Sequence, residues 1–454
     1  MLTKGCHSDS VRYFIFKSKN LILNFNFLRL IKSDILRNSA ILISGTAFAQ
    51  LIPILLQPLL RRSFTPDTFG AYSVYMSLLG ILIVISSLKY ELAIILPEKD
   101  NEAMAVFFLS VILNFVFNLI LFIVILIFKT QLLSILNLQQ KFSIYLLLTP
   151  AGIFLFGFYQ SINYWLIRKK GFMAISINKF VRRGAEGASQ ITFVFARVAN
   201  GLIFGDLLGH IANITSGLVQ GIKTGLSIKL FSPRRTIYVL KRYSHYPKYN
   251  FLPAFMEACS FLMPVIMINK FFSSASTGYF DLCKLLLSVP LALIATSLSN
   301  VLLQRISEKD RLKLSIKDDL LNVLKIISLI VVAEIAVILL FGDDLFKLVF
   351  GPNWEISGRI SRILVWSFAF NFLTSSFSSI FISLKKIKLL SVWQIFYFAA
   401  IILLVFFSHL SFESFLKVYV IIEVICSSIV SSLLLFVITR YEREILALNL
   451  SDTE

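Results

Sequence analysis

A stripe of charged side chains interrupts one of the apolar segments of the sequence. Lys179, Arg182, Arg183 and Glu186 recur three or four residues apart, which places them on one face of an α-helix. Arginine and lysine pair strongly with phosphate oxygens, and the attraction is larger in a low-dielectric interior than in water. The stripe therefore predicts a site for an anionic group inside a mainly apolar protein.

These charges have two possible surroundings in a membrane. Insertion scales assign about 2.5–3.5 kcal/mol to one charged side chain at the centre of a membrane helix, so such residues normally face protein or an aqueous cavity. We expect Lys179, Arg182 and Arg183 to line a cavity. The alternative, which is strongest for Lys179, is that they lie at the cytoplasmic end of the helix and extend to the membrane surface.

Further charged residues lie in other apolar segments. Asp281 and Lys284 are three residues apart and can pair within one helix. Glu257 and Glu423 have no basic residue within a turn, and such carboxylates are often proton or sodium sites, or partners of a cation on another helix. The predicted cavity cations are Arg182, Arg183, Lys179, Lys284 and Lys89, and the predicted ion-coupling or cavity carboxylates are Glu186, Glu257, Asp281 and Glu423.

The sequence lacks the motifs that support catalysis. It has no phosphate-cradling glycine loop, no ATP-binding motif and no Ser/His/Asp set. Its four cysteines show neither metal-site nor disulfide spacing. We therefore expect no catalytic residue, no metal and no cofactor, and we expect that the protein is not an enzyme.

The elements that must position these charges are membrane helices. The chain of 454 residues is 57% hydrophobic and 15% charged, whereas soluble domains have about 25% charged residues. Its apolar runs are continuous and about 20 residues long, which predicts spanning helices rather than strands. The fold class is therefore all-α, a polytopic membrane protein. We expect twelve spans, at 38–60, 71–95, 102–128, 142–166, 174–196, 200–222, 250–272, 279–304, 319–341, 360–383, 387–408 and 414–439.

The formal net charge of +19 is spread over short clusters between the spans. A nucleic-acid-binding protein would gather its basic residues in one domain, so we do not expect nucleic acid as a partner. The basic residues concentrate in alternate loops, chiefly 223–248 and 305–317. By the positive-inside rule both termini face the cytoplasm, which requires an even number of spans.

The two halves of the chain resemble each other. Phe69-Gly70-Ala71-Tyr72 opens the second span, and Thr277-Gly278-Tyr279-Phe280 opens the eighth. With six spans in each half, the copies insert in the same orientation, which predicts two six-helix bundles around a central cavity. The alternative is chance similarity between apolar segments.

This organisation predicts five regions along the chain. They are a basic amphipathic cytoplasmic segment (1–37), the first bundle (38–226), a basic cytoplasmic linker (227–249), the second bundle (250–440) and a cytoplasmic tail (441–454). Residues 1–37 interleave apolar and basic side chains, which is typical of a segment lying on an anionic membrane surface. A later translation start is the alternative interpretation of this region.

Several segments of the sequence resemble those of one membrane-protein family. Residues 38–50, 64–72, 88–97 and 246–253 are similar to segments that open the two halves of bacterial O-antigen and capsule flippases. These Wzx-type proteins belong to the multidrug/oligosaccharidyl-lipid/polysaccharide exporter superfamily. The resemblance covers nearly the whole chain from about residue 34, and 88–97 is its most specific part.

The resemblance implies a transporter of the bacterial inner membrane that works by alternating access. Its implied cargo is an undecaprenyl-pyrophosphate-linked oligosaccharide, and its implied energy source is a proton or sodium gradient. Implied partners are membrane lipids and the polysaccharide polymerase and chain-length proteins.

The alternative functions would require different features in the sequence. A cation-coupled multidrug exporter of the same superfamily would favour an acidic, aromatic cavity. A membrane glycan polymerase or ligase would need a large external loop, and a scaffold would need no buried charges. The sequence specifies neither the glycan, nor the coupling ion, nor the oligomeric state.

Overall fold

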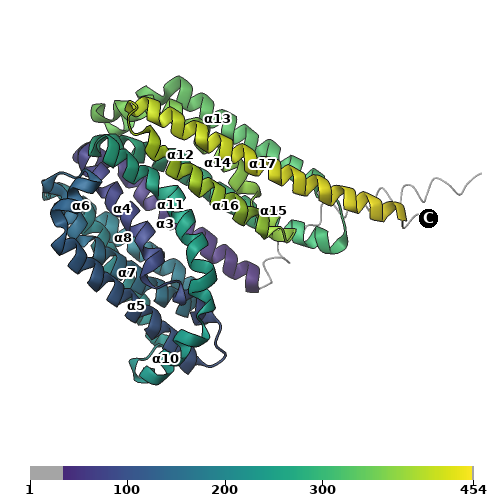
Figure 1. The fold of residues 1–454 in the computed structure, drawn as a ribbon, viewed down its shortest axis with the longest axis horizontal. Coiled ribbons are helices and arrows are strands. Elements are labelled where there is room, and N and C mark those ends of the chain that lie inside the picture. Colours follow the sequence, from purple (N-terminus) through teal and green to yellow (C-terminus); the bar gives the residue numbers. More distant parts are fainter. Residues whose placement is uncertain (1–33, 452–454) are drawn as a thin grey trace, which may run out of the picture.

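The computed structural model describes residues 34–451, and within that range the chain folds into α-helices and short 3₁₀ turns without a β-strand (Figure 1). Ten of these helices are long and apolar enough to cross a membrane. The predicted all-α, polytopic membrane fold is therefore confirmed. Most of the predicted N-terminal segment, before residue 34, and residues 452–454 of the predicted tail lie outside the described residues.

Six long helices make up the first half of the chain. Their bounds are α3 (Asp34–Ser63), α4 (Pro66–Ser86), α5 (Asp100–Ile127), α7 (Ser143–Arg168), α8 (Phe172–Phe195) and α9 (Gly201–Lys223). Shorter elements are η1 (Tyr90–Ile95), α6 (Lys129–Leu136) and η2 (Gln140–Phe142). Helix α8 is not among the ten apolar helices, since its central part contains the charged stripe that begins at Lys179.

The second half repeats this arrangement. Its long elements are α11 (His245–Phe271), α12 (Ser274–Leu312), α13 (Lys317–Phe350), α14 (Glu355–Phe377), α16 (Ile387–Ile402) and α17 (Phe412–Ser451). Its short elements are α15 (Ser379–Ser383), η4 (Pro352–Trp354) and η5 (Leu403–Phe407), and the connection between the halves holds η3 (Ile228–Leu230) and α10 (Pro233–Arg242). Each of the twelve predicted spans thus coincides with one long helical segment.

The second span is shorter than the sequence suggests. It was expected to reach residue 95, but α4 ends at Ser86. Leu88 and Lys89 adopt left-handed backbone conformations, with φ of 52° and 64°, and the chain continues as the 3₁₀ turn η1. A right-handed helix cannot pass through such residues, so Lys89 lies beyond the end of the span.

The two glycines of the internal repeat lie where the halves touch most closely. A Cβ atom on Gly70 would lie 1.7 Å from the carbonyl oxygen of Ser274, and one on Gly278 would lie 2.1 Å from that of Pro66. Because glycine has no side chain, the first turn of each helix can pack directly against the glycine of the other helix. The N-caps match as well, since Thr65 of α4 and Ser273 of α12 each accept a hydrogen bond from the amide three residues on. These reciprocal contacts support the repeat.

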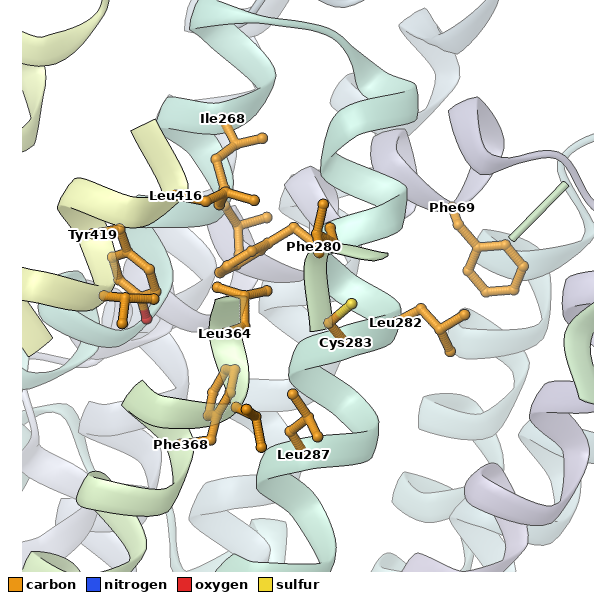
Figure 2. Close-up of a cluster of buried hydrophobic side chains, with 14 of the residues drawn as sticks. Phe69, Ile268, Phe280, Leu282, Cys283, Leu287, Leu364, Phe368, Leu416 and Tyr419 are labelled. Carbon is orange, nitrogen blue, oxygen red and sulfur yellow. The ribbon is translucent and has the colours of Figure 1, made fainter. Parts of the chain in front are cut away.

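The hydrophobic core continues across this contact. One cluster of buried side chains joins Phe280, Leu364 and Tyr419 of the second half to Phe69 and Leu202 of the first. Figure 2 shows Phe280 and Phe69 on opposite sides of α12, so this helix contributes to both halves. The halves approach each other where α4 and α12 begin, which we call the closed end. They diverge toward α10 and the C-terminal part of α17, which we call the open end (Figure 1).

The glycine contact gives a direct test of this arrangement. Replacing Gly278 by alanine forces a methyl group against the backbone of Pro66. We expect Gly278→Ala to lower the stability of the purified protein by about 1–3 kcal/mol, the usual cost of overpacking. Thermal unfolding in detergent would measure the change.

The matched control lies in α8. No atom lies within 4 Å of the position that a Cβ on Gly184 would take. Gly184→Ala should leave stability unchanged or raise it by up to about 1 kcal/mol, because alanine favours a helix more than glycine does. Equal melting temperatures for the two variants would contradict the close contact.

Candidate functional site

A cavity of about 880 Å³ lies between the two halves. Its lining runs along α12 from Asp281 to Asn300, a distance of about 28 Å at the usual helical rise. Helices α3, α4, α8, α11 and α14 supply the other walls. Its charged lining residues are Arg61, Arg183, Glu186 and Asp281, two cations and two carboxylates.

Arg61 joins the halves at the closed end of this cavity. Its guanidinium is ion-paired with Asp281 of α12 and donates a hydrogen bond to the carbonyl of Gly278 over 3.3 Å. The aromatic ring of Phe69 stacks on it, with 3.6 Å from ring centre to guanidinium carbon. Arg61 is 2% exposed, so protein groups rather than water surround its guanidinium, and Asp281 supplies the counter-charge. The sequence analysis did not single out Arg61, because it lies at the end of a span beside Arg62.

Arg183 is the second cation of the cavity, and it pairs with Glu186 within α8. Its Nη1 lies 2.8 Å from Glu186 Oε2. The side chains are 21% and 8% exposed, so the pair is partly open to the cavity. Both residues were predicted to face a cavity, and the structure places both in its lining.

Arg182 points away from that lining into a polar cluster of the first half. Its Nη2 lies 3.6 Å from Asp206 Oδ1 and 3.1 Å from His210 Nε2, both on α9. The guanidinium has no acceptor, so it donates and the imidazole nitrogen accepts. The hydroxyl of Tyr75 on α4 donates to Asp206 over 2.9 Å. Asp206 and His210 are fully buried.

Asp206 and His210 were missed in the sequence. They belong to the span predicted at 200–222, which was identified from its apolar character alone. The available signal was the spacing of four residues, which places an aspartate and a histidine on one face of a membrane helix.

Lys284 and Glu423 lie in the second half and do not line the cavity. Lys284 Nζ donates to the carbonyl of Phe261 over 2.6 Å and lies 3.5 Å from the centre of its ring. Glu423 is 4% exposed and accepts a hydrogen bond of 2.7 Å from the hydroxyl of Tyr397. The predicted pairing of Lys284 with Asp281 does not form, since Asp281 pairs with Arg61 instead.

Three other predicted residues lie apart from the cavity lining. Lys179 donates to the hydroxyl of Thr46 over 2.7 Å, which ties α8 to α3. Lys89, beyond the end of α4, lies 4.0 Å from Glu91. Glu257 is exposed on α11. The cavity is therefore less cationic than expected, because each of its arginines has a carboxylate partner.

No group of three or more His, Cys, Asp or Glu side chains within residues 34–451 is placed to hold a metal ion. The charged and polar side chains that line the cavity offer charge pairing and hydrogen bonding to a ligand. Outside the spans, Tyr243 donates to Glu102 over 3.0 Å, and burial together with this carboxylate raises the pKa of Tyr243 to about 12. This contact fixes the connection between the halves to the start of α5.

The sequence was compared with known families. Residues 59–358 match a family described as polysaccharide biosynthesis protein. This match covers well over half of the chain. The chain belongs to the polysaccharide biosynthesis protein family. No match was found among curated proteins.

Solved structures show the same fold. The lipid II flippase MurJ in an inward closed conformation aligns with a TM-score of 0.68 at 16% identity, covering 91% of this chain and 93% of that one. An inward-facing MATE family multidrug transporter of the MOP superfamily aligns with a TM-score of 0.63 at 16% identity, covering 88% and 95%. A MOP superfamily transporter from Pyrococcus furiosus aligns at 0.54 and 15% identity, covering 93% and 98%. This polysaccharide biosynthesis protein therefore has the multi-pass membrane fold of MOP superfamily transporters.

The buried cluster around Arg182 predicts strong energetic coupling between α8 and α9. Asp206→Asn should destabilise the protein by about 3–5 kcal/mol, because it leaves a guanidinium that is only 16% exposed without its counter-charge. The double variant Arg182→Gln/Asp206→Asn should recover part of that loss. A thermodynamic cycle from unfolding measurements should give a coupling energy of at least about 1 kcal/mol.

The control is an exposed pair of the same type. Arg440 and Glu444 on α17 are 61% and 62% exposed and lie 3.2 Å apart. The same cycle on this pair should give at most about 0.5 kcal/mol. A coupling energy for Arg182 and Asp206 as small as this would show that the cluster does not hold the two helices together.

Proposed function

We propose that this protein is a flippase that moves undecaprenyl-pyrophosphate-linked oligosaccharides across the bacterial inner membrane for polysaccharide synthesis. The observation that carries the proposal is the cavity between the halves, lined by Arg61 and Arg183, in a member of the polysaccharide biosynthesis family. A diphosphate is the anionic part of such a cargo. Both arginines can exchange a carboxylate oxygen for a phosphate oxygen.

The size of the cavity suits the head of such a cargo. Its volume of about 880 Å³ falls within the range of about 300–1,000 Å³ that is usual for ligand sites. Serine and asparagine side chains of α12 and α14, among them Ser288, Asn300 and Asn371, offer hydrogen bonds to sugars. The prenyl chain would remain in the surrounding lipid, since it is as apolar as the membrane interior.

The conformation supports a loading state in an alternating-access cycle. The halves are sealed at the closed end and diverge at the open end. The fold aligns better with an inward-facing MATE family transporter, at a TM-score of 0.63, than with an outward-facing one, at 0.56. We infer that the open end and both termini face the cytoplasm, as the positive-inside rule predicts. No catalytic step is required, and polymerase and chain-length proteins would act on the product.

Complementation tests this function. In a flippase-null strain that makes the matching glycan, wild type should restore surface polysaccharide. Arg183→Ala removes a charge-assisted bond of about 1.5–3 kcal/mol to the cargo, so it should reduce surface glycan about tenfold or more. Lys284→Ala, outside the cavity lining, should have a smaller effect. Surface glycan is measured at equal expression.

Arg440→Ala is the control for loss of a basic residue, because Arg440 is 61% exposed and does not line the cavity. It should complement as well as wild type. Failure of wild type itself, with its own glycan and with insertion verified, would reject the flippase function and favour a drug exporter. Full activity of Arg183→Ala would retain the function but reject this cation as a cargo contact.

A further inference from the structure

Arg61 separates the cavity from a second pocket. This outer pocket, of about 860 Å³, lies at the closed end between the end of α3 and the end of α13. Its charged lining residues are Arg61, Arg62, Asp344 and Lys347. Arg61 lines both spaces. A head group that leaves the cavity by the closed end must therefore pass this side chain.

Arg61 is also one of the residues that attach the first half to the second. Besides Asp281 and Gly278 it engages η4, since Trp354 Nε1 donates to the carbonyl of Arg61 over 2.7 Å. All three partners belong to the second half. Within the first half, Gln57 accepts from Arg61 Nε over 2.9 Å and orients the guanidinium. Loss of these bonds would allow the two halves to separate at the closed end.

The repeat places a neutral counterpart at the equivalent position. Asn269 lies nine residues before Gly278, as Arg61 lies nine residues before Gly70. Asn137 donates to the carbonyl of Asn269 over 3.1 Å, in the way that Trp354 donates to Arg61. The Asn269 side chain donates in turn to the carbonyl of Leu136. Of these two equivalent positions, the one at Arg61 carries a charge and the one at Asn269 is neutral, although Lys270 beside Asn269 also donates to the carbonyl of Ser134 over 3.0 Å.

The charged attachment is open to competition. The Asp281 side chain is 30% exposed and lines the cavity, whereas Arg61 is almost fully buried behind it. An anionic group in the cavity therefore meets Asp281 first, and repulsion between like charges weakens the bond from Asp281 to Arg61. A diphosphate offers the guanidinium more acceptor oxygens than a carboxylate does.

We propose that Arg61 is a cargo-binding residue, and that the diphosphate of the cargo replaces Asp281 on Arg61 and so opens the closed end. The proposal rests on the flippase function proposed above. Arg62 and Lys347 then receive the head group in the outer pocket. The interactions of both residues are weaker than those of Arg61. Lys347 pairs with Glu355 at 3.2 Å on the surface, and Arg62 donates to uncharged backbone carbonyls of α13.

Spin labels can measure the closed end in the purified full-length protein. Thr130 on α6 and Ser411 before α17 are exposed and belong to different halves. Both would be replaced by cysteine and labelled in a background that carries Cys6→Ser, since Cys6 lies outside the described residues, whereas Cys259, Cys283 and Cys426 are buried and can stay. Asp281→Asn should raise the ratio of open to closed distances at least about tenfold, which corresponds to about 1.4 kcal/mol. Glu444→Gln, which removes an exposed carboxylate of α17 outside both pockets, should leave this ratio unchanged.

A second arm adds geranylgeranyl diphosphate as the probe, with geranylgeraniol as its uncharged control. The diphosphate should shift the labelled wild type toward the open distance, and the alcohol should not. Arg61→Gln should be open without the probe and insensitive to it. If that variant fails to fold, Arg61→Lys keeps the charge without the two-pronged geometry and should respond less than wild type.

The outcomes separate the two proposals. A closed distance distribution in Asp281→Asn would overturn the attachment at Arg61 and leave the flippase function to the complementation test. Opening in Asp281→Asn with no response of wild type to the diphosphate would overturn the exchange of partners. An equal response to the alcohol would overturn it too, since the head group would then have no role.

Discussion

The cost of placing charge in an apolar interior governs the arrangement of this protein. Each arginine of the cavity is matched by a carboxylate, Arg61 by Asp281 and Arg183 by Glu186. Arg182, behind the cavity wall, is matched by Asp206. An unmatched ion would cost several kcal/mol in such surroundings. The pair Arg61–Asp281 therefore joins α3 to α12, and the pair Arg182–Asp206 joins α8 to α9, by charge as well as by apolar packing.

Charge pairing also explains why the cavity can be polar without being strongly cationic. A cavity with free cations would have to attract counter-ions or remain hydrated in the absence of cargo. Paired arginines avoid this, and they remain able to bind phosphate because a carboxylate can be exchanged for it. For the cargo of the proposed function, affinity would thus be moderate, which suits a transporter that has to release what it binds.

The sequence predicted the fold better than the site, and for physical reasons. The length and continuity of apolar runs determine spanning helices, so all twelve segments were located. The break at Leu88 and Lys89 was not, because left-handed backbone at non-glycine residues has no clear sequence signal. Helical spacing correctly placed Arg183 and Glu186 on one face. It could not show that Arg182 turns toward Asp206, or that Asp281 pairs with a residue of the other half, since pairs between distant helices depend on tertiary packing.

The charged stripe of α8 has a consequence for how the chain enters the membrane. With Lys179, Arg182, Arg183 and Glu186 in its central part, α8 is a poor candidate for insertion as a single helix. Its neighbour α9 follows after a short turn and presents Asp206 and His210 to it. Inserted together as a helical hairpin, the two would carry Arg182 and Arg183 into the bilayer already paired with Asp206 and Glu186. The pair that joins α8 to α9 in the folded protein would then also make α8 leave the translocon together with α9 rather than before it.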